Sequence, residues 1–350
     1  MQGFFQYYFN ITDDGDEHAV CCPFPHQTSS GLEYFETHPS AHVNLRKQLF
    51  HCKVCGAGHS EVSFIKAKLE CTYANAVRLS KAFNNTEDMV EWNEYVTMSE
   101  EAVNLCRSFS ITDATIDELD IKSTVPGKIM FPVAMYGKLL DIRTYEPGGD
   151  PKVKSRIGAA YGLVIPWDIW QKTAPNRTTL ICAGEKDMAV ARSYGFNAIT
   201  LTGGEATLPF SPAWFRDRDV VILYDNDNTG KVGAHKLASY LIDYCHTVKV
   251  CTEFHKVCKE DKEDLTDFFN KYHGTKEQLI EFMDKTPVYT REDCVQHSTI
   301  PLVSLQEATT PEYLNKVVRS NIQVAAVSEV QYMLPTTIVG EKVRDAGKDD

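Results

Sequence analysis

Four metal-ligating residues near the N-terminus constrain the fold most strongly. Cys52 and Cys55 are separated by two residues and are followed by Gly56. This pattern is typical of a zinc knuckle, because two thiolates at that spacing can bind one tetrahedral ion. Cys22 and His26 provide the second pair that the ion needs. Four side chains that are distant in the sequence therefore have to meet at one point, and four protein ligands predict structural rather than catalytic zinc.

The choice among neighbouring ligands stays open at this point. Cys21 could replace Cys22, and four other histidines compete with His26: His38, His42, His51 and His59. The chain has eleven cysteines, an odd number, and its N-terminal segment is acidic and lacks the basic region of a secretory signal. We therefore expect a reducing cytoplasm rather than a disulfide framework.

Length and composition predict a globular chain with more than one domain. The 350 residues correspond to two or three domains. The hydrophobic share of 43% is ordinary for a folded chain, and no apolar run is long enough for a transmembrane helix, so we expect no membrane partner. The net charge of −12 excludes a uniformly basic nucleic-acid coat but not a local basic groove.

Alternating periodicities predict how the chain is organised. Residues 61–109 have helical spacing, and residues 110–126 are polar and indicate a linker. Residues 128–147 alternate and turn at Tyr136–Gly137, which predicts a hairpin. From 178 to 285, strands and helices alternate, and this pattern predicts a parallel sheet covered by helices.

Acidic residues follow one strand that is expected to be buried on both faces. The apolar run Val220–Leu223 leads into Asp225 and Asp227. Carboxylates at the C-terminal end of a parallel strand project into the crevice where α/β sheets bind ligands, and hard oxygen pairs hold Mg²⁺. An ordinary Asn/Asp turn is the alternative.

Two more acidic groups strengthen the expectation of a metal site. Glu185 and Asp187 follow another apolar strand, and Asp264 and Asp267 lie at a helix start after a third. Asp264 could also be a helix N-cap, and the charged run around it could be solvated surface. We expect the three acidic groups to converge on one edge of the sheet.

A basic segment precedes the acidic one. Residues 121–160 hold seven basic residues against three acidic ones, although the rest of the chain is acidic. A basic patch beside a metal site suits a phosphate-rich substrate, and a solvated surface is the alternative. The candidates for phosphate binding are Lys128, Arg143, Lys152, Lys154 and Arg156.

The order of these features resembles the bacterial replicative primases and, more closely, the primase half of bacteriophage primase–helicase proteins. CPFPH and FHCKVCGAG resemble the family's zinc ribbon, although the family usually has CPFH and Pro25 is an extra residue here. GKIMFPVAMYGKLLDIRTY and GLVIPWD resemble the first part of its RNA polymerase domain. AGEKD, DND and KEDLTD resemble the three acidic motifs of a Toprim domain.

The resemblance implies a multidomain α/β fold, an N-terminal zinc ribbon followed by an RNA polymerase domain that contains a Toprim parallel α/β sheet. The expected divisions are a zinc-binding domain at 1–70, a helical linker region at 71–126, a basic part of the polymerase domain at 127–176, a Toprim catalytic domain at 177–290, and an extension or the start of a further domain at 291–350.

The chain departs from the Toprim pattern at one position. The first motif of the family begins with Glu, a general acid/base or a metal ligand, and Ala183 stands there in this chain. Alanine can do neither, so we predict that this chain is catalytically inactive. The alanine could belong to a naturally degenerate member of the family or result from an engineered Glu-to-Ala change. Because the other motif residues are intact, we favour the engineered change. Glu185 is a possible substitute two residues along the turn.

The function that the resemblance implies is DNA-dependent RNA priming by two-metal nucleotidyl transfer. Asp225, Asp227 and Asp264 would hold Mg²⁺ or Mn²⁺, with Asp187 as a further catalytic residue, and the zinc ribbon would contact the template. The implied partners are single-stranded DNA, ribonucleoside triphosphates and a replicative helicase, fused or separate, in a bacterial host cytoplasm if the chain is phage-encoded. The rival functions are a Toprim nuclease or topoisomerase, and a non-catalytic zinc-containing DNA-binding module.

Overall fold

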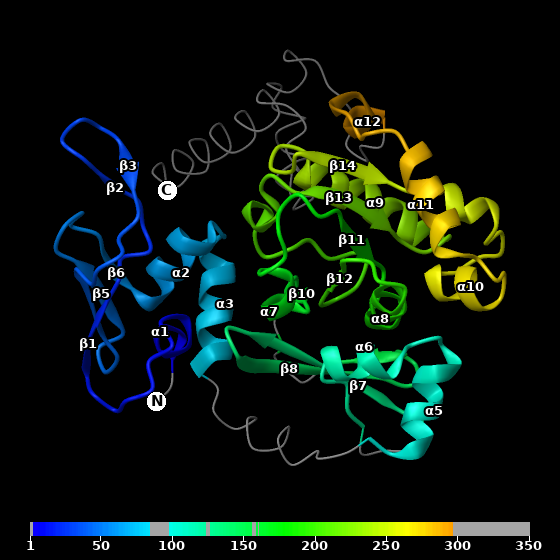
Figure 1. Cartoon of the computed structure of the whole chain (residues 1–350), viewed down its shortest axis with the longest axis horizontal. Coiled ribbons are helices and arrows are strands. Elements are labelled where there is room, and N and C mark those ends of the chain that lie inside the picture. The colour runs from blue at the N-terminus through cyan, green and yellow to red at the C-terminus, as the bar shows by residue number, and fades with distance from the viewer. Residues whose placement is uncertain (1–2, 85–97, 124–126, 156–158, 160, 297–350) are drawn as a thin grey trace, which may run out of the picture.

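The computed structural model describes residues 3–84, 98–123, 127–155, 159 and 161–296. Figure 1 shows small β-sheets (blue) at one end of the molecule, a three-stranded sheet (cyan to green), and a larger α/β sheet (green to yellow). Arg156 and the segment 297–350, for which the sequence predicts phosphate binding and an extension, lie outside the described residues. Among the helices that are described, none has both the length and the apolar character needed to cross a membrane.

The N-terminal part is built from two small antiparallel sheets. One has four strands in the order β1-β4-β5-β6, and the other pairs β2 with β3. In β4 and β5, alternate residues are buried, as expected for a sheet with one solvated face. The strands are β1 (Glu17–Val20), β2 (His26–Gln27), β3 (Glu33–Tyr34), β4 (Ala41–Asn44), β5 (Leu49–Cys52) and β6 (Gly58–Ser60).

Helices α1 (Phe4–Tyr8), α2 (Glu61–Leu69) and α3 (Tyr73–Asn84) pack beside these sheets. Phe64 of α2 lies at the centre of an aromatic core, with ring centroids 5.1 Å from Phe5 and 5.0 Å from Phe50. Tyr8 of α1 also contacts Tyr136, in the turn of the three-stranded sheet, with ring centroids 5.2 Å apart. Helix α1 therefore contacts the turn of the three-stranded sheet directly and the small sheets through Phe64 of α2.

The central part confirms the predicted hairpin. Strands β7 (Ile129–Met135) and β8 (Lys138–Tyr145) pair antiparallel, and β9 (Val153–Lys154) joins β8. The turn falls at Tyr136 and Gly137, both of which have positive φ. Helices α5 (Glu100–Ser108) and α6 (Asp113–Glu118) precede the hairpin. Thr112 caps α6, so a short helix lies inside the segment whose polar composition predicted a linker.

The larger sheet has five strands in the order β10-β12-β11-β13-β14. The predicted parallel pairing is confirmed for the last four, which are β11 (Thr179–Cys182), β12 (Ala198–Leu201), β13 (Asp219–Leu223) and β14 (Thr247–Val250). The short strand β10 (Val164–Ile165) differs, because it pairs antiparallel with β12 at the sheet edge. Two apolar residues are too short a run for periodicity to reveal.

Helices flank this sheet and connect its strands. Helix α8 (Glu185–Ser193) packs on β11 and β12, and α9 (Asn228–Leu241) packs on β13 and β14. The remaining helices are α7 (Trp167–Trp170), α10 (Leu265–Asn270), α11 (Lys276–Lys285), α12 (Arg291–Gln296) and the 3₁₀ helices η1 (Pro212–Phe215) and η2 (Glu253–Lys256). Since β11, β12 and β13 are neighbours and parallel, the loops after them meet at one edge of the sheet.

Candidate functional site

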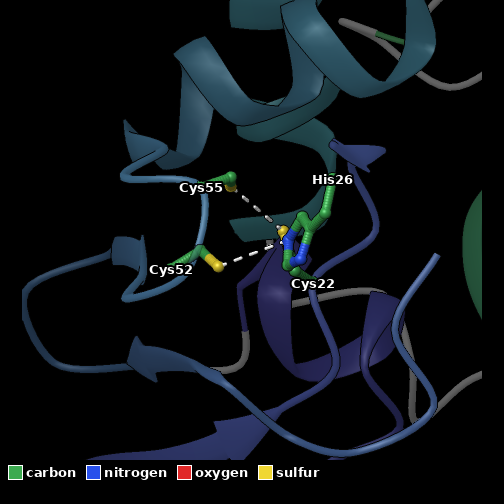
Figure 2. A group of neighbouring side chains, drawn as sticks. All are labelled: Cys22, His26, Cys52 and Cys55. Atoms are coloured by element: carbon green, nitrogen blue, oxygen red, sulfur yellow. Dashed lines mark hydrogen bonds between the residues drawn. The ribbon is translucent and has the colours of Figure 1, made fainter. Parts of the chain in front are cut away.

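The four N-terminal metal ligands predicted from the sequence meet at one point. The ligand atoms of Cys22, His26, Cys52 and Cys55 all lie within 4.8 Å of one another, and Figure 2 shows them facing one another. Cys22 Sγ lies 3.8 Å from Cys55 Sγ, and Cys52 Sγ lies 3.5 Å from His26 Nε2. Zn–S and Zn–N bonds of about 2.3 and 2.0 Å separate two tetrahedral ligand atoms by about 3.5–3.8 Å. The donor set and its spacing therefore fit one zinc ion.

A carboxylate lies beside the histidine of this group. His26 Nδ1 lies 3.4 Å from Glu36 Oε1, and Glu36 Oε2 accepts the N–H of Cys22 at 2.8 Å. The buried Nδ1 has no hydrogen-bond partner in the described part of the chain, and Nε2 is the ring nitrogen that faces the thiols. The competing residues Cys21, His38, His42, His51 and His59 are not members of the group. His26, which the extra Pro25 had left open, is the histidine that the structure brings to the three thiols.

The thiols differ in their readiness to ionise. Burial raises the pKa of Cys22 to about 12. Burial also opposes the thiolate of Cys52, but hydrogen bonds from Ser40 and from the turn backbone outweigh it and lower its pKa to about 6. All eleven cysteines lie in the described part of the chain, and the structure has them as free thiols.

The acidic residues lie where the strands of the larger sheet end. Ala183 and the first turn of α8 follow β11, and Asp225 and Asp227 follow β13. Asp264 is the N-cap of α10, and Thr266 in the same helix donates to Asp187 Oδ1 from both its N–H (3.1 Å) and its hydroxyl (2.6 Å). The structure thus brings Asp187 and Asp264 together, although they are far apart in the sequence.

Lys186 lies between these carboxylates. Its Nζ is 2.6 Å from Asp264 Oδ2 and 3.4 Å from Asp187 Oδ1. Burial disfavours the ammonium charge, but Asp187 and Asp264 outweigh burial and raise the pKa of Lys186 above its usual value. Lys186 therefore supplies one permanent positive charge to the carboxylates at the C-terminal ends of the parallel strands. We call this group, Asp187, Asp225, Asp227 and Asp264, the acidic edge.

One positive charge does not neutralise the group. Burial, together with the charges of Asp187, Glu205 and Asp264, raises the pKa of Asp225 to about 9. Burial and the charge of Asp187 raise the pKa of Asp264 to about 7. The side-chain oxygens of Asp225 accept no hydrogen bond from the residues that the structure describes. Hard oxygen donors of this kind suit a divalent cation such as Mg²⁺ in their chemistry. Within the described ranges, the zinc ligands are the one group of side chains whose ligand atoms are already gathered as closely as a bound ion needs.

Two of the acidic residues also have structural roles, as the alternatives allowed. Asp227 is the N-cap of α9, and its Oδ1 accepts the N–H of Gly230 at 2.7 Å. Asp264 forms a capping box with Asp267 at the start of α10. Capping uses one carboxylate oxygen in each interaction and holds the side chain in a fixed direction.

Glu185 and Arg143 form an ion pair with each other. Arg143 Nε donates to Glu185 Oε1 at 2.6 Å, both side chains are buried, and Arg143 also contacts the hydroxyl of Ser155. The guanidinium of Arg143 is thus occupied by Glu185, and the carboxylate of Glu185 is neutralised locally. Phosphate binding by Arg143 and replacement of the missing acid by Glu185 stay predictions, and each would require this ion pair to open.

The other basic candidates lie on the three-stranded sheet. Lys128 and Lys154 both contact Glu146, with N–O distances of 3.3 Å, and Lys152 is exposed. One carboxylate shared between two ammonium groups leaves this surface with a net positive charge. The described part of the basic segment is therefore a mixed, accessible surface.

The sequence analysis missed one acidic residue, Glu205, in the loop after β12. Its Oε1 accepts the backbone N–H of Asp225 at 2.8 Å. Burial, and then the charges of Asp227 and Asp187, raise its pKa to about 7, although the hydrogen bond from Asp225 opposes the rise. The signal that could have found it is its place soon after an apolar strand, the same rule that selected the other acidic groups.

Comparison with known proteins identifies the N-terminal part. Residues 3–95 match the family described as the CHC2 zinc finger. The DNA primase of Legionella pneumophila is 31% identical over 70 residues, which are 20% of this chain and 11% of that protein. The match thus spans about a tenth of the length of this curated relative. The predicted resemblance to primases with a zinc ribbon is confirmed for the N-terminal part of the chain, which matches the CHC2 zinc finger family.

Solved structures give a weaker likeness over more of the chain. The zinc-binding and RNA polymerase domains of Aquifex aeolicus primase are 16% identical with a TM-score of 0.46, covering 90% of this chain and 87% of that one. The primase fragment of the bacteriophage T7 primase-helicase protein is 13% identical with a TM-score of 0.41, covering 75% and 99%. Both TM-scores are below 0.5, so neither likeness decides the activity of this chain. The predicted fold class, a zinc ribbon followed by a mostly parallel α/β sheet, is confirmed.

Proposed function

We propose that this chain, with its CHC2 zinc ribbon, is a DNA-dependent RNA primase that makes short RNA primers on single-stranded DNA. The observation that supports this most is the meeting of Asp187, Asp225 and Asp264 at one sheet edge, in a chain that also carries such a ribbon. The zinc is structural and shapes a surface for the template. Ribonucleoside triphosphates are the proposed substrates.

The proposed division of labour follows from the side chains at the sheet edge. Asp225, Asp227 and Asp264 would hold Mg²⁺ or Mn²⁺, because their oxygens are hard donors in a group that repels itself. Two such ions would supply positive charge to a triphosphate and to an attacking 3′-hydroxyl. The capping interactions of Asp227 and Asp264 orient their carboxylates in advance, and two bonds from Thr266 do the same for Asp187.

The prediction that Ala183 leaves the chain without primer synthesis stays a prediction. A methyl group can neither accept a proton nor bind a cation, and loss of a general base typically costs about 10²–10⁴-fold in rate. Metal and nucleotide binding are expected to survive, because the other carboxylates remain. This chain should therefore bind nucleotide and template yet make little or no primer.

The test is primer synthesis from labelled ribonucleotides on single-stranded DNA. The variants to compare are the chain as it stands, Ala183→Glu, and Ala183→Glu combined with Asp227→Ala. Primer synthesis by Ala183→Glu that is lost when Asp227→Ala is added would support the proposed function. It would also support position 183 as the place of the missing acid. If the unchanged chain is as active as Ala183→Glu, the inactivity prediction is wrong and another group replaces the missing acid.

The same assay separates the rival functions. Cleavage of the DNA without primer synthesis would indicate a Toprim nuclease or topoisomerase and contradict the proposal. Retained DNA binding with neither reaction, in all three proteins, would indicate a non-catalytic zinc-containing module. The replicative helicase stays an expectation from the resemblance, and co-purification with the chain is the way to test it.

The basic segment is the proposed contact for the phosphate backbone. Lys128, Lys152 and Lys154 neutralise charge without reading bases, so binding of single-stranded DNA should weaken steeply with salt. Replacing Lys152, Lys154 and Arg156 together by Ala should flatten that dependence, measured by fluorescence anisotropy. An unchanged slope would place the DNA-binding surface elsewhere.

A further inference from the structure

The central strand of the acidic edge, β11, is not followed directly by an acidic residue. Strand β11 lies between β12 and β13, and it ends at Cys182, so Ala183 is the first residue beyond it. Asp225 and Asp227 follow the neighbouring strand β13, and Asp187 lies in α8, which begins two residues after Ala183. A carboxylate is therefore missing where the three strand ends meet.

The side chain of Glu205 reaches across this gap. Glu205 belongs to the loop after β12, yet its Oε1 accepts the N–H of Asp225, which follows β13. Since β11 separates these two strands, a contact between the loops that follow them has to pass the C-terminal end of β11, the end that Ala183 follows. The other oxygen, Oε2, accepts no hydrogen bond from the described part of the chain.

Helix α9 holds the loop in this position. A Cβ on Gly233 would lie 2.3 Å from the carbonyl oxygen of Glu205, so the loop backbone lies directly against the helix. A Cβ on Gly230 would lie 2.8 Å from Glu205 Oε1. Lys236 Nζ donates to the carbonyl of Ala206 at 3.1 Å. Two glycines and one lysine of the same helix thus position the backbone and the carboxylate of Glu205.

We propose that Glu205 takes over the metal-binding role of the acid missing at position 183, but not its role in proton transfer, and holds a divalent cation together with Asp225 and Asp187. The charges of Asp187 and Asp227 both act on Glu205, so its carboxylate belongs to the same electrostatic group. This inference rests on the proposed function, in which the acidic edge binds Mg²⁺ or Mn²⁺. It adds a carboxylate from a loop to a site otherwise built from strand ends and helix caps.

The test measures Mn²⁺ binding by electron paramagnetic resonance, which reports free Mn²⁺ and does not depend on activity. Glu205→Gln keeps the size of the side chain and an acceptor for the N–H of Asp225, but it removes the charge. We expect the dissociation constant for Mn²⁺ to rise tenfold or more. Glu277→Gln is the matched control, because Glu277 is exposed in the first turn of α11, and it should bind Mn²⁺ as the unchanged chain does.

A double-mutant cycle tests whether carboxylates at positions 183 and 205 would bind the same metal ion. Ala183→Glu should restore Mn²⁺ binding to the Glu205→Gln protein and add much less to the unchanged chain. An equal gain in Mn²⁺ affinity in both backgrounds would overturn the proposal, because the two carboxylates would then act independently. Circular dichroism of each variant establishes that it is folded.

Asp225→Asn separates failure of this inference from failure of the proposed function. If Asp225→Asn weakens Mn²⁺ binding but Glu205→Gln does not, Glu205 is no part of the site and the metal site stands. If neither substitution changes Mn²⁺ binding, the acidic edge is not the metal site and both proposals are wrong.

Discussion

Gly233→Ala in α9 tests how closely the Glu205 loop is fitted to the sheet. The added Cβ would lie 2.3 Å from the carbonyl oxygen of Glu205, whereas ordinary contacts begin at 3.4 Å, so the loop backbone has to retreat by about an ångström. Overpacking of this kind typically costs about 1–3 kcal/mol. Replacing glycine by alanine inside a helix stabilises the folded state by up to about 1 kcal/mol through helix propensity. We expect a net loss of up to about 2 kcal/mol in the free energy of unfolding.

The measurements are urea unfolding and Mn²⁺ affinity on the same protein. Mn²⁺ binding should weaken along with stability, because the backbone that has to move carries the Glu205 carboxylate. Val232→Ala is the control, since Val232 is the exposed neighbour in the same helix, and its effect should stay within about 0.5 kcal/mol. A Gly233→Ala protein that is about 1 kcal/mol more stable and binds Mn²⁺ unchanged would refute this reasoning, because helix propensity alone would then account for the result.

Three further predictions concern the rest of the molecule. Cys52→Ser should release the zinc, seen by elemental analysis, and should loosen the zinc ribbon in hydrogen exchange while the larger sheet stays protected; equal loss of protection in both would contradict independent folding. Arg143→Met should cost about 3–5 kcal/mol in urea unfolding, because it leaves the buried carboxylate of Glu185 unpaired, and adding Glu185→Gln should recover most of that loss. Without added divalent metal, the protein should lose stability as the pH rises from about 4 toward 9, because the raised pKa values of Asp225 and Asp264 stabilise the folded state fully only below their unfolded pKa values of about 4. Mg²⁺ should therefore raise the melting temperature more at pH 8 than at pH 6, and a melting temperature that climbs with pH in metal-free buffer would contradict the assignment.

Local patterns predicted the elements whose signals are local. The turn at Tyr136–Gly137 was predictable because two alternating runs flank it, and the parallel strands were predictable because apolar runs alternate with helical ones. The zinc ligands were predictable because metal geometry restricts their spacing. The choice of His26 required the structure, since its burial and its contact with Glu36 depend on residues that are distant from it in the sequence.

Contacts between distant segments were not predictable from spacing. Arg143 looked like a free cation in a basic stretch, but the fold places it against Glu185, forty-two positions away. Glu205 looked like a loop residue after a glycine turn, because nothing in its own segment shows that it meets Asp225. In both cases a charged side chain meets its partner through packing between segments that are distant in the sequence, which a single sequence does not display.

The short strand β10 also affects how this protein behaves at high concentration. A long exposed edge strand invites pairing with another chain and so promotes aggregation. Here one edge is the two-residue β10, which Pro166 follows without an N–H to donate, and the other is the four-residue β14, which carries Lys249. Lys249 Nζ donates to the carbonyl of Met283, so its side chain is directed to the neighbouring helix. Short edges, one with a proline and one with a lysine, give another sheet little to pair with and favour a chain that stays dispersed.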